Sequence, residues 1–384
     1  MKKAEKTVFC IVLLLALAPL HALYGESGFK QFFQGKEKKI IRTLSIEEKV
    51  GQIFIFGFAG DALDADYSAW LASGRLGNVK IFARNVDSRN QLRDLTDTIA
   101  RLSEGSQFSI PPFIATDLEG GAVNHIRYSG MPTIPPAATI SSRKQCVDIS
   151  RTIAVILTET GINMNFAPCA DVRTNPDNTV IGNRSYSSDP RVVYTMVRAF
   201  IIEHEKAGIV PVAKHFPGHG MTDFDSHYKA KSVDTRFREL RKIHLLPYRR
   251  LIGKSLLHSV MLAHVTYNAI DPNNPATFSP LVVDQLLRKK MHFRGITVTD
   301  DLEMESSERY AGGIEQAFIR AFEAGNDLFL VAHSKRKQAL LLRRVPELLR
   351  SGVLSEDELD RKVLRVLRTK KKSLRRFYAI QARG

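Results

Sequence analysis

The segment Lys214–His227 gathers the side chains best suited to chemistry. It reads Lys-His-Phe-Pro-Gly-His-Gly-Met-Thr-Asp-Phe-Asp-Ser-His, with three histidines and two aspartates in fourteen positions. Its proline and glycines disfavour a regular helix, so we expect a loop. Asp225 and His227 are separated by one residue and could form a carboxylate–imidazole pair. Such a pair can transfer protons near neutral pH.

A second acidic pair, Asp300 and Asp301, ends the mostly apolar run Gly295–Leu302. We expect the Asp300 carboxylate to face a site and Asp301 to cap the helix that follows. With a proton donor on another loop, Asp300 could be the nucleophile of a retaining glycosidase, in which the two groups stand about 5 Å apart.

Short apolar runs separated by segments compatible with helix indicate how these groups are positioned. Eight such runs are Ile53–Phe56, Val79–Phe82, Phe113–Ala115, Asn163–Phe166, Val210–Ala213, Val260–Leu262, Ile296–Val298 and Leu328–Val331. Runs of this kind are typical of buried parallel strands. We therefore predict an α/β fold, a single (β/α)₈ TIM-type barrel.

Polar residues follow five of these runs, at Asp117, Asp171, His215, His264 and Asp300. In a barrel the carboxyl ends of the strands share one face, so these side chains should converge on one site.

Three further patterns concern local structure. Ser45 and Glu48 fit a capping box, and Ser355 precedes acidic residues that should open a helix. Cys146 and Cys169 are too few for a disulfide framework, and we expect two free thiols.

The ends of the chain differ in character. Residues 1–25 have a basic start and an apolar run from Val8 to Leu20, which predicts a signal peptide or an N-terminal anchor. We expect export, to the periplasm or the cell exterior, with residues 26–384 as one domain.

The formal net charge is +16, and residues 335–384 hold sixteen Lys and Arg against five Asp and Glu. A basic helical tail from about 361 could bind an anionic wall polymer or lipid surface, or be only a solvated helix face. Export argues against nucleic acid as a partner.

Several motifs together resemble glycoside hydrolase family 3, in its bacterial β-N-acetylglucosaminidase (β-hexosaminidase) branch. The resemblance rests on Lys214–Gly220, Asp225–His227, Thr299–Leu302 and Asp117–Gly121, and it runs from about Ser45 to about Leu330. It implies a barrel and a two-step retaining hydrolysis of terminal β-linked N-acetylglucosamine, on peptidoglycan fragments or related amino-sugar chains.

The resemblance also implies roles. Asp300 matches the nucleophile, His227 the acid/base and Asp225 its partner. Asp117, Arg184, Lys214 and His215 match residues that hold the sugar. The chain departs from the family where Glu119-Gly-Gly-Ala-Val-Asn-His125 replaces a pattern with two arginines, so His125 stands where an arginine holds the sugar. The resemblance implies no cofactor, no metal and an amino-sugar substrate, and we expect a monomer.

Three other interpretations stay open. His215, His219, Asp223, Asp225 and His227 could hold a metal, although their spacing fits no compact helical site. Phosphate could replace water as the acceptor, because a histidine acid/base need not repel it as a glutamate would; the protein would then be a phosphorylase. The chain could also be a sugar- or wall-binding protein that keeps the fold without catalysis.

Overall fold

The computed structural model describes residues 29–224 and 232–382. Asp225 and His227 therefore lie outside the described residues. Each of the eight expected runs coincides with a parallel strand. These strands are β1 (Phe54–Gly57), β2 (Asn78–Lys80), β3 (Phe113–Thr116), β6 (Met164–Asn165), β7 (Val210–Pro211) continuing into β8 (Ala213–Phe216), β10 (Ser259–Leu262), β13 (Ile296–Thr299) and β14 (Phe329–Val331).

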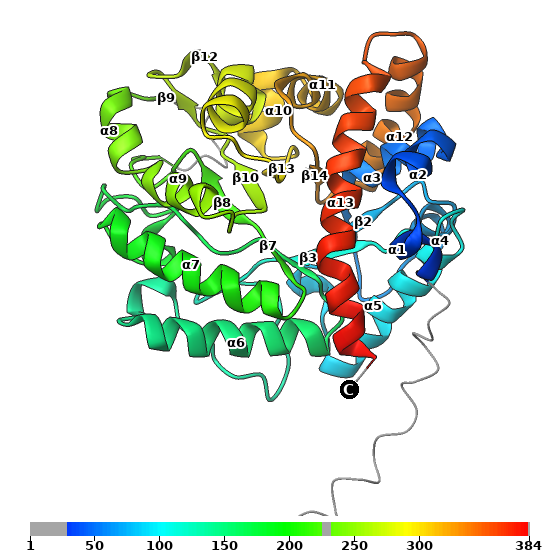
Figure 1. The fold of residues 1–384 in the computed structure, drawn as a ribbon, viewed down its shortest axis with the longest axis horizontal. Coiled ribbons are helices and arrows are strands. Elements are labelled where there is room, and N and C mark those ends of the chain that lie inside the picture. Colours follow the sequence, from blue (N-terminus) through cyan, green and yellow to red (C-terminus); the bar gives the residue numbers. More distant parts are fainter. Residues whose placement is uncertain (1–28, 225–231, 383–384) are drawn as a thin grey trace, which may run out of the picture.

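Helices connect these strands and cover them on the outside (Figure 1). They are α1 (Lys30–Gln34), α2 (Glu37–Thr43), α3 (Ile46–Ile53), α4 (Ala65–Ala72), α5 (Arg89–Glu104), α6 (Arg143–Glu159), α7 (Pro190–Lys206), α8 (Phe237–Lys242), α9 (Leu246–Gly253), the π-helix η6 (Leu281–Lys290), α10 (Glu305–Ala311), α11 (Ile314–Ala324), α12 (Lys335–Arg350) and α13 (Glu356–Gln381). Short strands lie in the loops: β4 (Leu118–Gly120), β5 (Val123–Asn124), β9 (Ser232–Val233), β11 (Thr266–Tyr267) and β12 (Asp271–Pro275).

The parallel strands form a six-stranded sheet of order β14-β1-β2-β3-β6-β7 and a three-stranded sheet of order β13-β10-β8. The two sheets meet at a parallel bridge between Val298 and Leu328 and at another between Cys169 and Lys214. The mixed α/β class and the order of strands and helices are as predicted.

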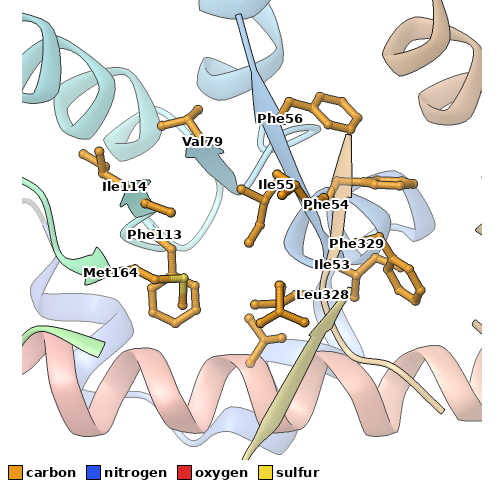
Figure 2. Packing of buried hydrophobic residues seen from close by; sticks show 14 of the residues in the cluster. Ile53, Phe54, Ile55, Phe56, Val79, Phe113, Ile114, Met164, Leu328 and Phe329 are labelled. Atoms are coloured by element: carbon orange, nitrogen blue, oxygen red, sulfur yellow. The ribbon is translucent and has the colours of Figure 1, made fainter. Parts of the chain in front are cut away.

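Side chains alternate across the strands. On β1, Phe54 and Phe56 point to one side of the strand and Ile55 points to the other (Figure 2), as the two-residue period of a strand requires. The ring of Phe54 lies 5.2 Å from that of Phe318 on α11, so this side packs against the covering helices. All three strand residues are fully buried. A strand buried on both faces explains why the run reads as continuously apolar.

The structure confirms the two predicted helix starts and the two predicted free thiols. Ser45 and Glu48 form both halves of a capping box at the start of α3. Ser355 caps α13 through its bond from the Glu358 backbone nitrogen. Cys146 and Cys169 are buried free thiols.

The basic segment from about 361 is the larger part of α13. One face of this helix is buried and carries Leu367, Leu374 and Phe377. Lys370 is also fully buried, and its ammonium donates to Gln52 Oε1 at 2.8 Å. In Figure 1 the helix ends near α5 and α6, where Gln381 bonds the Thr158 carbonyl oxygen. Among the described residues no helix is both long and apolar enough to cross a membrane.

Candidate active site

One cavity of about 440 Å³ opens where the parallel strands end. The six predicted site residues that the structure describes all line it: Asp117, His125, Arg184, Lys214, His215 and Asp300. They come from loops after β3, β6 and β13 and from β8 itself. Of the five strand-end residues expected to converge, Asp117, His215 and Asp300 line this cavity, whereas Asp171 and His264 do not. Asp171 contacts His215, and His264 Nε2 lies 3.0 Å from the Asp301 carbonyl oxygen.

Lys214 is the centre of the charged wall of the cavity. Its ammonium lies 2.6 Å from Asp117 Oδ1 and 2.7 Å from Glu119 Oε1. Lys80, at the end of β2, bonds the other oxygen of Asp117. Burial by itself raises the pKa of Asp117, but Lys214 and Lys80 outweigh it and hold that pKa well below its usual range. Asp117 is thus an ionised acceptor at neutral pH.

Arg184 and Glu119 form a two-pronged ion pair beside this group. The guanidinium donates to the two carboxylate oxygens at 2.8 and 3.0 Å. Burial raises the pKa of Glu119, but Arg184 and Lys214 more than offset this and lower it to about 2. Such a planar pair has a fixed geometry. Arg184 is thereby held at the cavity wall with a defined orientation.

His215 is oriented by Asp171, which follows β6. The Nδ1 atom of His215 lies 2.8 Å from Asp171 Oδ2, and the His215 backbone nitrogen donates to the same oxygen at 3.1 Å. Asp171 Oδ1 accepts from the His219 backbone nitrogen at 2.6 Å. With Nδ1 donating to the carboxylate, Nε2 of His215 is the acceptor atom, and it lies 3.5 Å from Arg184 Nη2.

His125 lies at the cavity edge with its ring centre 5.1 Å from that of Phe82. Its Nδ1 is 3.6 Å from Asp117 Oδ2, which is too long for a hydrogen bond. Burial lowers the pKa of His125 to about 4, and the attraction of Asp117 does not offset this. His125 is neutral at pH 7, in contrast with the arginine that the resemblance leads one to expect.

Asp300 and Asp301 both line the cavity, but their carboxylates make different contacts. Asp300 is half-buried and lines the cavity, and its Oδ1 accepts from the Asp301 backbone nitrogen at 2.8 Å. Asp301 Oδ1 accepts from the backbone nitrogens of Glu303 and Ala332 at 3.1 and 3.2 Å. It therefore ties the end of β13 to the end of β14.

The prediction that Asp301 caps the next helix is wrong. Helix α10 starts after Met304 and has no side-chain cap. The chain makes a turn between β13 and α10, and Asp301 stabilises that turn instead.

Residues 45–369 match the protein family described as "Glycosyl hydrolase family 3 N terminal domain". The chain belongs to glycoside hydrolase family 3.

Relatives within family 3 carry more specific names. The chain is 35% identical over 288 residues to a "Beta-hexosaminidase" from Tolumonas auensis, which covers 74% of this chain and 83% of that protein. It is 31% identical over 333 residues to "Beta-hexosaminidase A" from Pseudoalteromonas piscicida, covering 81% and 56%. A solved family 3 β-N-acetylglucosaminidase from Paenibacillus sp. str. FPU-7 aligns with a TM-score of 0.82 at 32% identity, covering 86% and 63%. The chain thus spans under two thirds of the latter two proteins. The predicted family and enzyme class agree with these names.

Two charged residues of this family 3 site, Lys80 and Glu119, were not predicted as site residues from the sequence. Lys80 stands inside an apolar strand, and a cation there signals a buried partner. Glu119 belongs to a motif that was recognised, but its pairing with Arg184 depends on a contact between distant loops. Asp171 is predicted at the site from its place after a strand, and the structure adds its role, which is to orient His215.

The glycines of the loop after β8 serve close packing. A side chain on Gly220 would come within 2.0 Å of the Val172 carbonyl oxygen, and one on Gly218 within 2.7 Å of His244 Cβ. The backbone at Gly218 also has φ +138°, which favours glycine. These contacts fix the chain that leads to Asp225 and His227.

Cys169, Asp171 and His215 place possible metal-binding atoms within 4.8 Å of one another. Both Asp171 oxygens already accept hydrogen bonds, from His215 and from the His219 backbone. Burial raises the pKa of the Cys169 thiol well above its usual value, so the thiolate that a metal requires is disfavoured. Of the other predicted metal ligands, Asp225 and His227 lie outside the described residues.

Proposed function

We propose that this protein is a retaining exo-β-N-acetylglucosaminidase. The observation that carries the proposal is the placement of Asp300 in one cavity with Asp117, Arg184 and Lys214, at the carboxyl ends of the strands of a family 3 chain. The names of the relatives support N-acetylglucosamine as the sugar. A cavity of about 440 Å³ lies within the range for small-ligand sites.

The charged wall would hold the sugar ring. The ionised Asp117 carboxylate can accept hydrogen bonds from hydroxyl groups, while Lys214 and Arg184 can donate them. These groups hold one another by ion pairs, so little reorganisation is needed when a sugar binds.

The reaction would take two steps. In the first, an Asp300 oxygen bonds to the anomeric carbon as the bond to the leaving oxygen breaks, and the His227 imidazolium gives that oxygen a proton. In the second, His227 takes a proton from water, whose oxygen replaces Asp300 at the anomeric carbon. Asp225 would orient His227. The configuration is retained because two displacements occur.

Four further inferences belong to the proposal. We infer that the parallel strands close into the (β/α)₈ barrel, and the bridge between Val298 and Leu328 supports this. We infer that residues 1–25 direct export or anchoring and that the protein is a monomer. Outside the cytoplasm its substrates would be peptidoglycan fragments or related amino-sugar chains.

Hydrolysis of 4-nitrophenyl N-acetyl-β-glucosaminide tests the proposal. Asp300→Asn should lose at least about a thousandfold in kcat/KM, whereas Asp301→Asn should keep activity within about tenfold, because an amide oxygen can still accept from Ala332. Hydrolysis that survives Asp300→Asn would refute the assignment, and no activity in the wild type would favour the non-catalytic interpretation.

Product analysis in phosphate buffer decides between the two acceptors. Free N-acetylglucosamine is the product if water is the acceptor, and N-acetylglucosamine 1-phosphate if phosphate is. Mass spectrometry after incubation with muropeptides and chito-oligosaccharides then identifies which kind of amino-sugar chain is the substrate.

A further inference from the structure

A second cavity, of about 260 Å³, lies at the opposite end of the strands. Its walls include Leu257 and His258, which precede β10, and Arg294 and Gly295, which precede β13. Another wall is the middle of α13, from Arg365 to Ser373, and this helix runs along the strands in Figure 1. Arg294 stands six residues before Asp300, which is about 20 Å along an extended chain. This cavity is therefore separate from the one with Asp300.

The lining of this cavity is strongly basic. Its titratable side chains are His258, His292, Arg294, Arg365, Arg368 and Lys372. Arg365 is neutralised by Asp327 at 2.7 Å. Arg294 and Arg368 make no ion pair with any residue in the described part of the chain, and both are exposed. The charge of Arg368 also acts on Glu37, which Lys371 already pairs at 3.2 Å. The two guanidinium groups therefore leave an excess of positive charge at the cavity, which attracts anions.

Lys372 adds a third cation. Its ammonium lies 2.7 Å from Nε2 of His258. Burial and the charge of Lys372 lower the pKa of His258 to about 4, so the imidazole is neutral and accepts the bond. Glu205 is the acid at this edge, 3.4 Å from His258 Nε2. Arg294, Arg368 and Lys372 together still leave the cavity with a net positive charge.

We propose that this cavity binds a phosphate-type oxyanion through Arg294, Arg368 and Lys372. Guanidinium groups match the geometry of phosphate oxygens, and Lys372 supplies a point charge beside them. Ser255 and Ser373 also line the wall, and their hydroxyls can donate to the same anion. The phosphate could be free or the headgroup of an anionic phospholipid. In either case the catalytic cavity at the other end of the strands stays open.

The test measures binding by the full-length protein. Inorganic phosphate is titrated by calorimetry at constant ionic strength, and sedimentation is measured with vesicles of phosphatidylcholine alone or with about 30 mol% phosphatidylglycerol. The variant Arg294→Ala/Arg368→Ala is compared with Arg343→Ala/Arg376→Ala. The control loses the same charge from exposed positions on α12 and α13 that do not line this cavity.

The proposal predicts at least about tenfold weaker binding in Arg294→Ala/Arg368→Ala and near wild-type binding in the control. Loss confined to the phosphate titration identifies a free anion, and loss confined to phosphatidylglycerol vesicles identifies a headgroup. Any contribution of residues 1–25 to vesicle binding is common to both variants. Absence of both kinds of binding in the wild type, or equal loss in the two variants, would overturn the proposal.

Discussion

At the scale of the residue, Lys214 holds together two buried carboxylates, Asp117 and Glu119. Lys214→Met keeps most of the aliphatic part of the side chain and removes its positive charge. The two negative carboxylates of Asp117 and Glu119 are then less compensated. We expect a loss of roughly 3–5 kcal/mol in the free energy of unfolding, since breaking a buried ion pair leaves an uncompensated charge. Urea unfolding of the wild type and the variant measures this difference in the free energy of unfolding.

The matched control is Lys289→Met, because Lys289 pairs with Asp284 at 2.7 Å and both side chains are exposed to solvent. An exposed pair contributes at most about 1 kcal/mol. If the two variants lose the same stability, the buried network is not the determinant that the geometry indicates.

The lowered pKa of Glu119 predicts how the stability of the protein depends on pH. Its pKa in the folded protein is lowered from the ordinary 4.5 to about 2, because Arg184 and Lys214 outweigh burial. The folded state therefore binds fewer protons than the unfolded state between these values, and stability falls as pH falls through them. Glu119→Gln should be less stable than wild type at pH 7, and the gap should narrow from about pH 4.5 towards pH 2. Thermal unfolding at a series of pH values measures this gap, and a constant gap would contradict the prediction.

His125 is a neutral contact and should not set the pH dependence of the reaction. With a pKa of about 4, it does not titrate between pH 5 and 8. His125→Gln should raise KM by about three- to tenfold, the equivalent of one hydrogen bond, and leave the shape of the kcat/KM profile unchanged. Loss or displacement of a limb of that profile would show that His125 carries a catalytic proton.

Sequence reasoning identified the side chains on the cavity wall better than the contacts among them. Asp300 could be predicted because it follows a recognisable strand, and Lys214 because it belongs to a motif that resembles the family. The role of Asp171 depends on how the loop after β6 meets β8, a contact between residues 44 positions apart. Periodicity carries no information on such a contact.

At the scale of the element, α13 shows why a basic composition is an incomplete guide. Its charged residues read as a solvated tail, yet the period of its apolar residues places Val363, Leu367, Leu374 and Phe377 in the core. Even Lys370 is buried there, bonded to Gln52 and the Gly77 carbonyl.

Truncation after Asp360 should therefore prevent folding. Each buried apolar side chain contributes about 1.5–3 kcal/mol, so the loss is comparable with the whole stability of a domain. A chain ending at Gln381 is the control and should fold normally, as circular dichroism and thermal unfolding would show. A stable, active protein lacking residues 361–384 would mean that the helix is dispensable.

At the scale of the whole molecule, the strand order was predictable because buried parallel strands are apolar throughout and helices separate them. The same order sets the cavity with Asp300 at one end and the cationic cavity at the other. The sequence alone did not separate the basic groups that face solvent from those that line a cavity, because His258, Arg294 and Arg368 meet only in the folded chain.

The central claim is that Asp300 forms a covalent bond to the sugar. A fluorinated N-acetylglucosaminide that slows the second step should accumulate this intermediate. Intact-protein mass spectrometry should show one added glycosyl group, and peptide mapping should place it on Asp300. An adduct on Asp117 or Asp301 instead, or turnover of the reagent with no adduct at any time, would contradict the account.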